Sequence, residues 1–174
     1  KGRCLLADEM RLGKTITVLY WLSLVKPKLV IVVCPSVAKY EWKGQAKKHL
    51  NKRTQVLQSQ TPYKTNCNFL ILNYDILPYW VNYLIKLKPE VVIFDESHYI
   101  KNRKSKRYKA AKKLTNKIKY IIAVSGTPAV NRPAELFTTL NIIRRDLFPS
   151  FWPSFAMRYC RPYRTPWGWD FSGS

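Results

Sequence analysis

The chain has 174 residues, the size of one ordinary domain with a real hydrophobic core. Because 47% of the residues are apolar, the composition favours a folded domain over an intrinsically disordered protein. Lysine and arginine outnumber aspartate and glutamate by 31 to 10, a net charge of +21 that favours nucleic acid over acidic small molecules as a partner. The alternative is that the lysines only keep the domain soluble.

Four cysteines lie far apart, none in a Cys-x-x-Cys pair, and there are only two histidines, so the sequence does not indicate a zinc site. A reducing, intracellular compartment fits this pattern. No apolar run approaches the ~18 residues of a membrane span, and no signal peptide opens the chain. We expect no membrane partner, a cytoplasmic location if the source is bacterial or viral, and a nuclear one if it is eukaryotic.

The first motif lies between a short apolar run at 4–7 and a helical pattern at 14–25. It reads Asp8-Glu9-Met10-Arg11-Leu12-Gly13-Lys14-Thr15. A strand, a tight loop and Gly-Lys-Thr opening a helix form the context of a nucleotide phosphate-binding loop. Backbone N–H groups would surround the phosphates of ATP, Lys14 would add a charge, and Thr15 would ligate Mg²⁺. The alternative is an ordinary loop.

Apolar runs then alternate with helical patterns along the chain. Strands are predicted at 29–34, 69–72, 91–94 and 120–124, and helices at 37–50, 75–86 and 104–116. This alternation predicts an α/β fold with a parallel sheet that has helices on both faces. In such sheets ligands bind at the carboxyl ends of the strands, which is where the motifs fall.

Two acids, Asp95 and Glu96, follow the predicted strand at 91–94. Phosphoryl transfer needs a carboxylate on the metal ion and a group that orients or deprotonates water. Asp95 would take the first role and Glu96 the second. The alternative, two solvated acids at a turn, is less favoured because a phosphate loop lies upstream.

A further turn, Ser125-Gly126-Thr127-Pro128, follows the strand at 120–124. At the end of a neighbouring strand, it would touch the loop at 95–98 and couple nucleotide state to another event. Beyond Asn141 the composition becomes rich in aromatic residues and proline. We predict a short helix at 154–160 and then irregular chain. The expected domains are a nucleotide-binding lobe at 1–146 and an aromatic-rich extension at 147–174.

Together these motifs resemble motifs I, II and III of the superfamily-two helicase-like ATPases. Asp-Glu-Met-x-Leu-Gly-Lys-Thr, Asp-Glu-Ser-His and Ser-Gly-Thr-Pro resemble the forms found in the Swi/Snf family of double-stranded-DNA translocases. Cys34-Pro35-Ser36 followed by Trp42 is similar to motif Ia, and Asn73-Tyr74-Asp75 to motif Ib. Residues 125–136, 158–160 and 166–174 resemble the HepA-related annealing-helicase branch.

The resemblance implies the first of two RecA-like lobes of a P-loop ATPase that uses ATP and Mg²⁺. The catalytic residues would be Lys14, Asp95 and Glu96, with Thr15 and Asp95 on the metal ion. The nucleotide-binding residues would be Asp8, Met10, Leu12, Gly13, Lys14 and Thr15. Coupling would fall to His98, Ser125, Gly126 and Thr127. The arginine finger would come from a second lobe of the same polypeptide, so we expect this piece alone to be poorly active.

The resemblance also implies that double-stranded or branched DNA binds beside motifs Ia and Ib and after motif II. The expected DNA-contacting residues are Pro35, Ser36, Asn73, Tyr74, Lys101, Asn102 and Arg103. For the lysines from 109 onward, a solvated helix face is an equal alternative. We expect a monomer. Two other functions stay open: the same lobe in a phage or restriction-associated translocase, and an ATP-independent DNA-binding module.

One residue departs from the family pattern. Arg11 stands where the family has glycine. If this position requires a positive φ, arginine is strained there by about 1 kcal/mol or more. The long cation could instead reach the phosphates or the partner lobe. We expect the loop to remain competent, because the other site residues are present.

Overall fold

The computed structural model describes residues 2–9, 11–126, 133–148 and 151–170. Its centre is a sheet of six strands in the order β1-β6-β5-β2-β4-β3, and every neighbouring pair is parallel. The strands are β1 (Arg3–Leu6), β2 (Val30–Cys34), β3 (Gln55–Val56), β4 (Phe69–Asn73), β5 (Val91–Phe94) and β6 (Tyr120–Val124). The predicted α/β class and parallel sheet are therefore confirmed.

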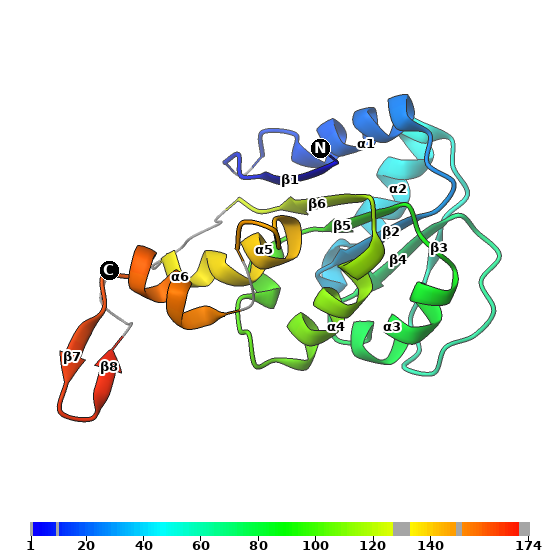
Figure 1. Cartoon of the computed structure of the whole chain (residues 1–174). Coiled ribbons are helices and arrows are strands. Elements are labelled where there is room, and N and C mark those ends of the chain that lie inside the picture. Colours follow the sequence, from blue (N-terminus) through cyan, green and yellow to red (C-terminus); the bar gives the residue numbers. More distant parts are fainter. Residues whose placement is uncertain (1, 10, 127–132, 149–150, 171–174) are drawn as a thin grey trace.

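Helices cover both faces of this sheet (Figure 1). Their bounds are α1 (Lys14–Val25), α2 (Lys39–Leu50), α3 (Leu77–Lys86), α4 (Lys106–Leu114), α5 (Leu136–Ile143) and α6 (Trp152–Tyr159). Single 3₁₀ turns occur at η1 (Ser36–Ala38), η2 (Ser97–Ile100), η3 (Thr115–Lys117) and η4 (Pro133–Glu135). Among the described residues, no helix is long and apolar enough to cross a membrane.

The core has two halves because β2, β4 and β5 are apolar on both faces and fully buried. On one face, α1 and α2 pack Leu19 and Trp42 against Val32. On the other, α3, α4 and α5 pack Trp80 and Ile142 against the same strands. The two layers fix the carboxyl edge of the sheet, where the sequence motifs lie.

The structure adds three elements to the prediction. β3 has only two residues, too few for a detectable period, and α5 has eight and follows η4. The chain predicted to be irregular after α6 forms an antiparallel hairpin, β7 (Tyr163–Thr165) and β8 (Gly168–Asp170). That part of the prediction was wrong, because its short alternating strands were obscured by Pro166 and two tryptophans.

The aromatic extension packs on the sheet domain through α5. Phe137 of α5 lies edge-on to Trp152 and Phe155 of α6, with ring centroids 5.0 and 5.1 Å apart. Cys160, fully buried, completes this cluster. The position of the expected domain boundary at 146 stays a prediction.

Candidate functional site

The loop between β1 and α1 has the backbone geometry of an anion cradle. Gly13, the residue before α1, has φ 77° and ψ 21°, a left-handed conformation that glycine adopts without steric cost. The first N–H groups of any helix lack acceptors within the helix and point out of its N-terminal end. A negatively charged group beyond Gly13 would therefore meet these donors and the positive end of the helix dipole.

Lys14 folds back over this loop. Its Nζ donates to the carbonyl oxygens of Asp8, at 2.9 Å, and Glu9, at 2.5 Å. The ammonium is thus held above the loop by two backbone oxygens, which exchange readily for the oxygens of a phosphate. Met10 lies outside the described residues, so the structure says nothing of its predicted role.

Arg11 has φ 66°. The position therefore does require a positive φ, the condition under which the sequence predicts strain. The left-handed conformation costs a non-glycine residue about 1 kcal/mol or more. Its side chain lines the same cavity as Lys14, so the guanidinium can approach a bound anion.

Asp95 follows β5 and is held from three sides. The indole Nε1 of Trp42 donates to Asp95 Oδ2 at 2.8 Å, and the hydroxyl of Tyr74 donates to the Asp95 carbonyl at 2.6 Å. The Asp95 N–H donates to the carbonyl of Val33 at 2.8 Å. Burial raises the pKa of the Asp95 carboxyl, while the Trp42 hydrogen bond opposes that rise.

Glu96 turns away from Asp95 because its backbone is left-handed, with φ 48° and ψ 59°. Its Oε2 lies 3.2 Å from Nδ1 of His98. Both atoms are buried, and neither has a hydrogen bond of good geometry within the described part of the chain. This proximity brings the predicted water-activating acid next to the predicted coupling residue.

One cavity of about 480 Å³ joins the phosphate loop to the two acids. Lys14 and Thr15 line it from α1, and Asp95 and Glu96 line it from the end of β5. The four residues given catalytic or metal roles are thus brought to one space at the carboxyl edge of the sheet. Gln45 also lines this cavity, and its Oε1 is buried without a hydrogen bond to any described residue.

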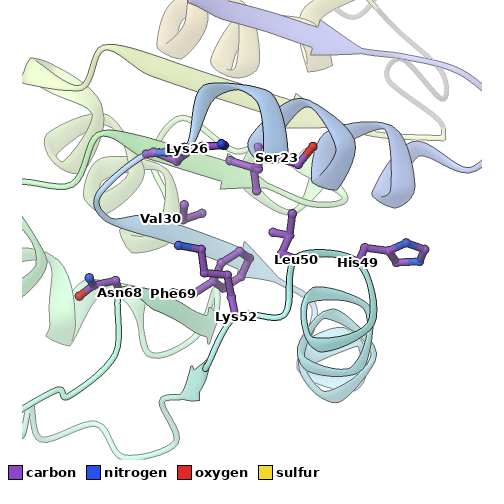
Figure 2. Close-up of a pocket in the computed structure, with 10 residues that line it drawn as sticks. Ser23, Lys26, Val30, His49, Leu50, Lys52, Asn68 and Phe69 are labelled. Atoms are coloured by element: carbon purple, nitrogen blue, oxygen red, sulfur yellow. The ribbon is translucent and has the colours of Figure 1, made fainter.

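A second cavity, of about 360 Å³, lies at the opposite edge of the sheet (Figure 2). Leu50, Val30 and Phe69 form its apolar side, and Lys26 and Lys52 lie at its margin. It contains no residue that the sequence assigned to catalysis. The residues to which the sequence assigned catalytic and metal roles instead line the cavity at the carboxyl edge.

The coupling turn follows β6, the strand next to β5. The Ser125 side chain is fully buried, and its N–H donates to the Leu6 carbonyl at 3.1 Å. Because Phe94 is paired with Ala123, Ser125 and Gly126 lie beside the Asp95–Glu96 turn at the sheet edge. Thr127 lies outside the described residues.

The predicted DNA residues after β2 and β4 differ in exposure. Ser36 is exposed at the start of η1, whereas Pro35 is buried. Asn73 is largely buried, and its Nδ2 donates to Asp75 at 3.2 Å. The Tyr74 side chain is 1% exposed and points to Asp95, so a DNA contact at this residue would have to come from its backbone.

The predicted DNA residues after η2 are exposed, but each has a structural partner. Lys101 pairs with Glu135 at 3.0 Å, and the Arg103 guanidinium lies 5.2 Å from the centre of the Trp152 ring. Asn102 Oδ1 accepts the N–H of Lys104 at 2.9 Å, which shapes the turn into α4. Lys104 and Lys106, in the same segment, are exposed.

Sequence reasoning missed what Trp42 and Tyr74 do for Asp95. The sequence identifies Trp42 only as part of a motif, and Tyr74 only as a DNA contact. A buried indole N–H or phenol O–H needs a polar partner, so a tryptophan at a buried position of a helix was a usable signal. The partner itself could not be read from the sequence, because it lies 53 residues away.

Comparisons with known proteins identify the family of this chain. The family model described as the SNF2-related domain matches residues 1–168. The chain is 39% identical to the Bos taurus SWI/SNF-related matrix-associated actin-dependent regulator of chromatin subfamily A-like protein 1, covering 100% of this chain and 19% of that protein. It is 32% identical to the Homo sapiens DNA annealing helicase and endonuclease ZRANB3, covering 99% of this chain and 17% of that protein.

Among solved structures, the chain is similar to the Sulfolobus solfataricus SWI2/SNF2 ATPase core in complex with dsDNA. The TM-score is 0.76 at 26% identity, over 89% of this chain and 34% of that one. This likeness confirms the predicted RecA-like ATPase fold. The chain spans about a fifth of the length of the curated relatives it matches.

Proposed function

The chain belongs to the SNF2-related domain family, and on this premise we propose that it is the ATP-binding and ATP-hydrolysing lobe of a double-stranded-DNA translocase. The observation that carries the proposal is the single cavity in which Lys14, Thr15, Asp95 and Glu96 meet. The relatives named as annealing helicases favour a motor of that type or a fork-remodelling one over a phage or restriction-associated machine.

The residues present fit a magnesium nucleotide. Mg²⁺ prefers hard oxygen donors, and the Thr15 hydroxyl and Asp95 carboxylate, which both line the cavity, would supply them. The helix end beyond Gly13 and the ammonium of Lys14 suit the β- and γ-phosphates. When bound, the metal ion neutralises charge that develops on the phosphate oxygens.

The chain's own groups divide the work. Asp95 is fixed in place by Trp42 and Tyr74, so its carboxylate needs no reorganisation to face the metal site. Glu96 orients the attacking water and accepts its proton, and His98 contacts the same carboxylate at 3.2 Å. Because His98 belongs to η2, a shift of Glu96 when the γ-phosphate is lost would move η2. η2 leads into the segment proposed to follow DNA.

Two partners complete this proposal. A second RecA-like lobe of the same polypeptide would add an arginine finger, worth on the order of 10³–10⁵ in rate in related nucleotidases, so this lobe alone turns ATP over poorly. Duplex DNA would lie along Ser36, the backbone of residues 73–74 and the segment 101–107. Exposed lysines there attract phosphates without reading bases, as a translocase requires.

The test is ATP turnover by the intact protein with and without duplex DNA. We expect DNA to stimulate turnover and Lys14→Ala to abolish it, because the variant loses the charge on the phosphates. Lys43→Ala, an exposed lysine on α2, is the matched control and should behave like the parent. If DNA does not stimulate ATP turnover and Lys14→Ala does not reduce it, the alternative of an ATP-independent DNA-binding module would be favoured.

A further inference from the structure

The hairpin of β7 and β8 has no role in the nucleotide site or the proposed duplex path. It projects away from the sheet and its helices beyond α6 (Figure 1). Thr165 pairs with Gly168 across its turn, and Gly168 has φ 121°, a conformation that glycine adopts and other residues avoid. The turn is therefore a defined structure that sets the direction of its side chains.

The two faces of the hairpin differ. Tyr163 and Asp170 are paired on one face, and the tyrosine hydroxyl donates to Asp170 Oδ2 at 2.9 Å. Arg164 and Trp169 are paired on the other face, because successive side chains of a strand alternate. On the first face the polar groups of Tyr163 and Asp170 are hydrogen-bonded to each other. The second face presents an arginine beside an indole.

The aromatic side chains of this open face and the turn are exposed to an unusual degree. Trp167, in the turn, is 97% exposed, and Trp169 is 52% exposed. Arg161 and Arg164 are exposed as well. Within the described ranges, no ring contact, ion pair or side-chain hydrogen bond engages Trp167, Trp169 or Arg164. Such large apolar groups are normally covered when the protein works.

The base of the hairpin is firmly held. Cys160, three residues before β7 begins, is fully buried and its N–H donates to the Ala156 carbonyl at 2.9 Å. α6 is packed on Phe137 through Trp152 and Phe155. The Trp152 ring, at the start of α6, also lies 5.2 Å from the Arg103 guanidinium, so the helix that precedes the hairpin packs against the segment proposed to follow duplex DNA.

From this geometry we propose that the hairpin is a second DNA site, which binds unpaired bases of a single-stranded segment. Indole rings stack on the flat faces of bases of any sequence, and neighbouring arginines pair with the phosphates. The inference deepens the proposed function and rests on it, since the segment proposed to follow duplex DNA packs against α6, the helix that precedes the hairpin.

Charge favours this occupant over another protein surface of the same kind. Arg164 is paired with Trp169, Arg161 lies just before β7, and the chain carries a net charge of +21. A second copy of this chain would be repelled, whereas a polyanion with planar rings satisfies both the arginines and the indoles.

The experiment measures fluorescence anisotropy of labelled oligo(dT), and separately of a blunt duplex, with the intact protein at fixed salt. Trp167→Ala should weaken oligo(dT) binding about tenfold, the usual scale for removal of one stacking residue, and Trp167→Tyr should restore most of it. Arg164→Glu should weaken it too. Blunt-duplex affinity should be unchanged. Tyr79→Ala, which removes an exposed aromatic ring from α3, is the matched control.

Unchanged oligo(dT) binding in both Trp167→Ala and Arg164→Glu would overturn the proposal. So would a loss of thermal stability and of duplex-stimulated turnover in Trp167→Ala with oligo(dT) binding intact, because the tip would then pack on protein. Lys14→Ala separates the two proposals. It should lose ATP turnover and keep oligo(dT) binding, so a failure of the motor proposal shows in turnover while a failure of this one shows in Trp167-dependent binding.

Discussion

At the scale of single residues, Arg11 is the residue of the phosphate loop that departs from the family pattern, which has glycine at this position. The sequence predicts strain there if φ is positive, and the structure has φ 66°. Replacement by glycine removes the steric cost but makes the unfolded chain more flexible. Arg11 is therefore a modest stability defect beside an otherwise complete set of site residues.

We expect Arg11→Gly to raise the free energy of unfolding by about 0.5 to 1 kcal/mol, from relief of the left-handed strain less the added flexibility of the unfolded chain. Chemical denaturation measures this change. DNA-stimulated ATP turnover should alter little. Arg11→Ala is the control, because it removes the guanidinium and keeps the strain. A large gain in turnover in the glycine variant would show that Arg11 cripples the loop.

Asp95 provides a pH-dependent prediction. Burial raises its pKa in the folded protein, so the folded state binds more protons than the unfolded state and this residue makes the protein less stable as pH rises. Asp95→Asn has no such titration. We expect the variant's free energy of unfolding, relative to the parent, to grow between about pH 4, the unfolded value of an aspartate, and neutral pH. Urea titrations across this range measure it, and a falling difference would contradict the assignment.

At the scale of elements, the sequence predicted what local pattern determines. β5 and β6 were predicted with their observed bounds, since each is a short β-branched run between polar turns. The helix predicted at 14–25 matches α1, whereas those predicted at 37–50, 75–86 and 104–116 begin two residues before α2, α3 and α4. η1 takes the place of the first turn before α2, and α6 begins two residues before its predicted start at 154. The roles of Trp42 and Tyr74 depend on contacts between distant segments, which no local pattern encodes.

The segment between η2 and α4 contains basic residues that differ in how far they are engaged in packing. From the sequence alone, charge reversal of Lys101 and Arg103 is the natural probe of DNA binding. In the structure, Lys101 pairs with Glu135 and Arg103 stacks on Trp152, so reversing them would disturb packing as well. Lys104 and Lys106 are exposed in the same segment and are better probes.

Lys104→Glu combined with Lys106→Glu should weaken duplex binding and flatten its salt dependence. Removing one lysine–phosphate interaction reduces the slope of log K against log salt by about 0.9. Lys47→Glu with Lys48→Glu makes the same charge change on exposed positions of α2 and serves as the control. Equal slopes for the two pairs would move the DNA path to another surface.

At the scale of the whole molecule, the proposals assign two kinds of contact with nucleic acid to one chain. The carboxyl edge of the sheet would hold the nucleotide and the duplex path, and α6, which packs on Arg103 of that path, precedes the exposed hairpin. The net charge of +21 gives all of these surfaces a common attraction for a polyanion. We therefore regard the chain as the DNA-gripping half of a motor whose cycle is completed by a second lobe.

The central claim, an ATP-driven motor on duplex DNA, is tested most directly by displacement of a third strand from a DNA triplex by the intact protein. Translocation along the duplex ejects that strand without unwinding the two others. We predict ejection that requires ATP and is lost in Glu96→Gln, which keeps the shape of the side chain but cannot accept the proton of water. Ejection that persists in Glu96→Gln, or none in the parent protein with ATP, would contradict the account.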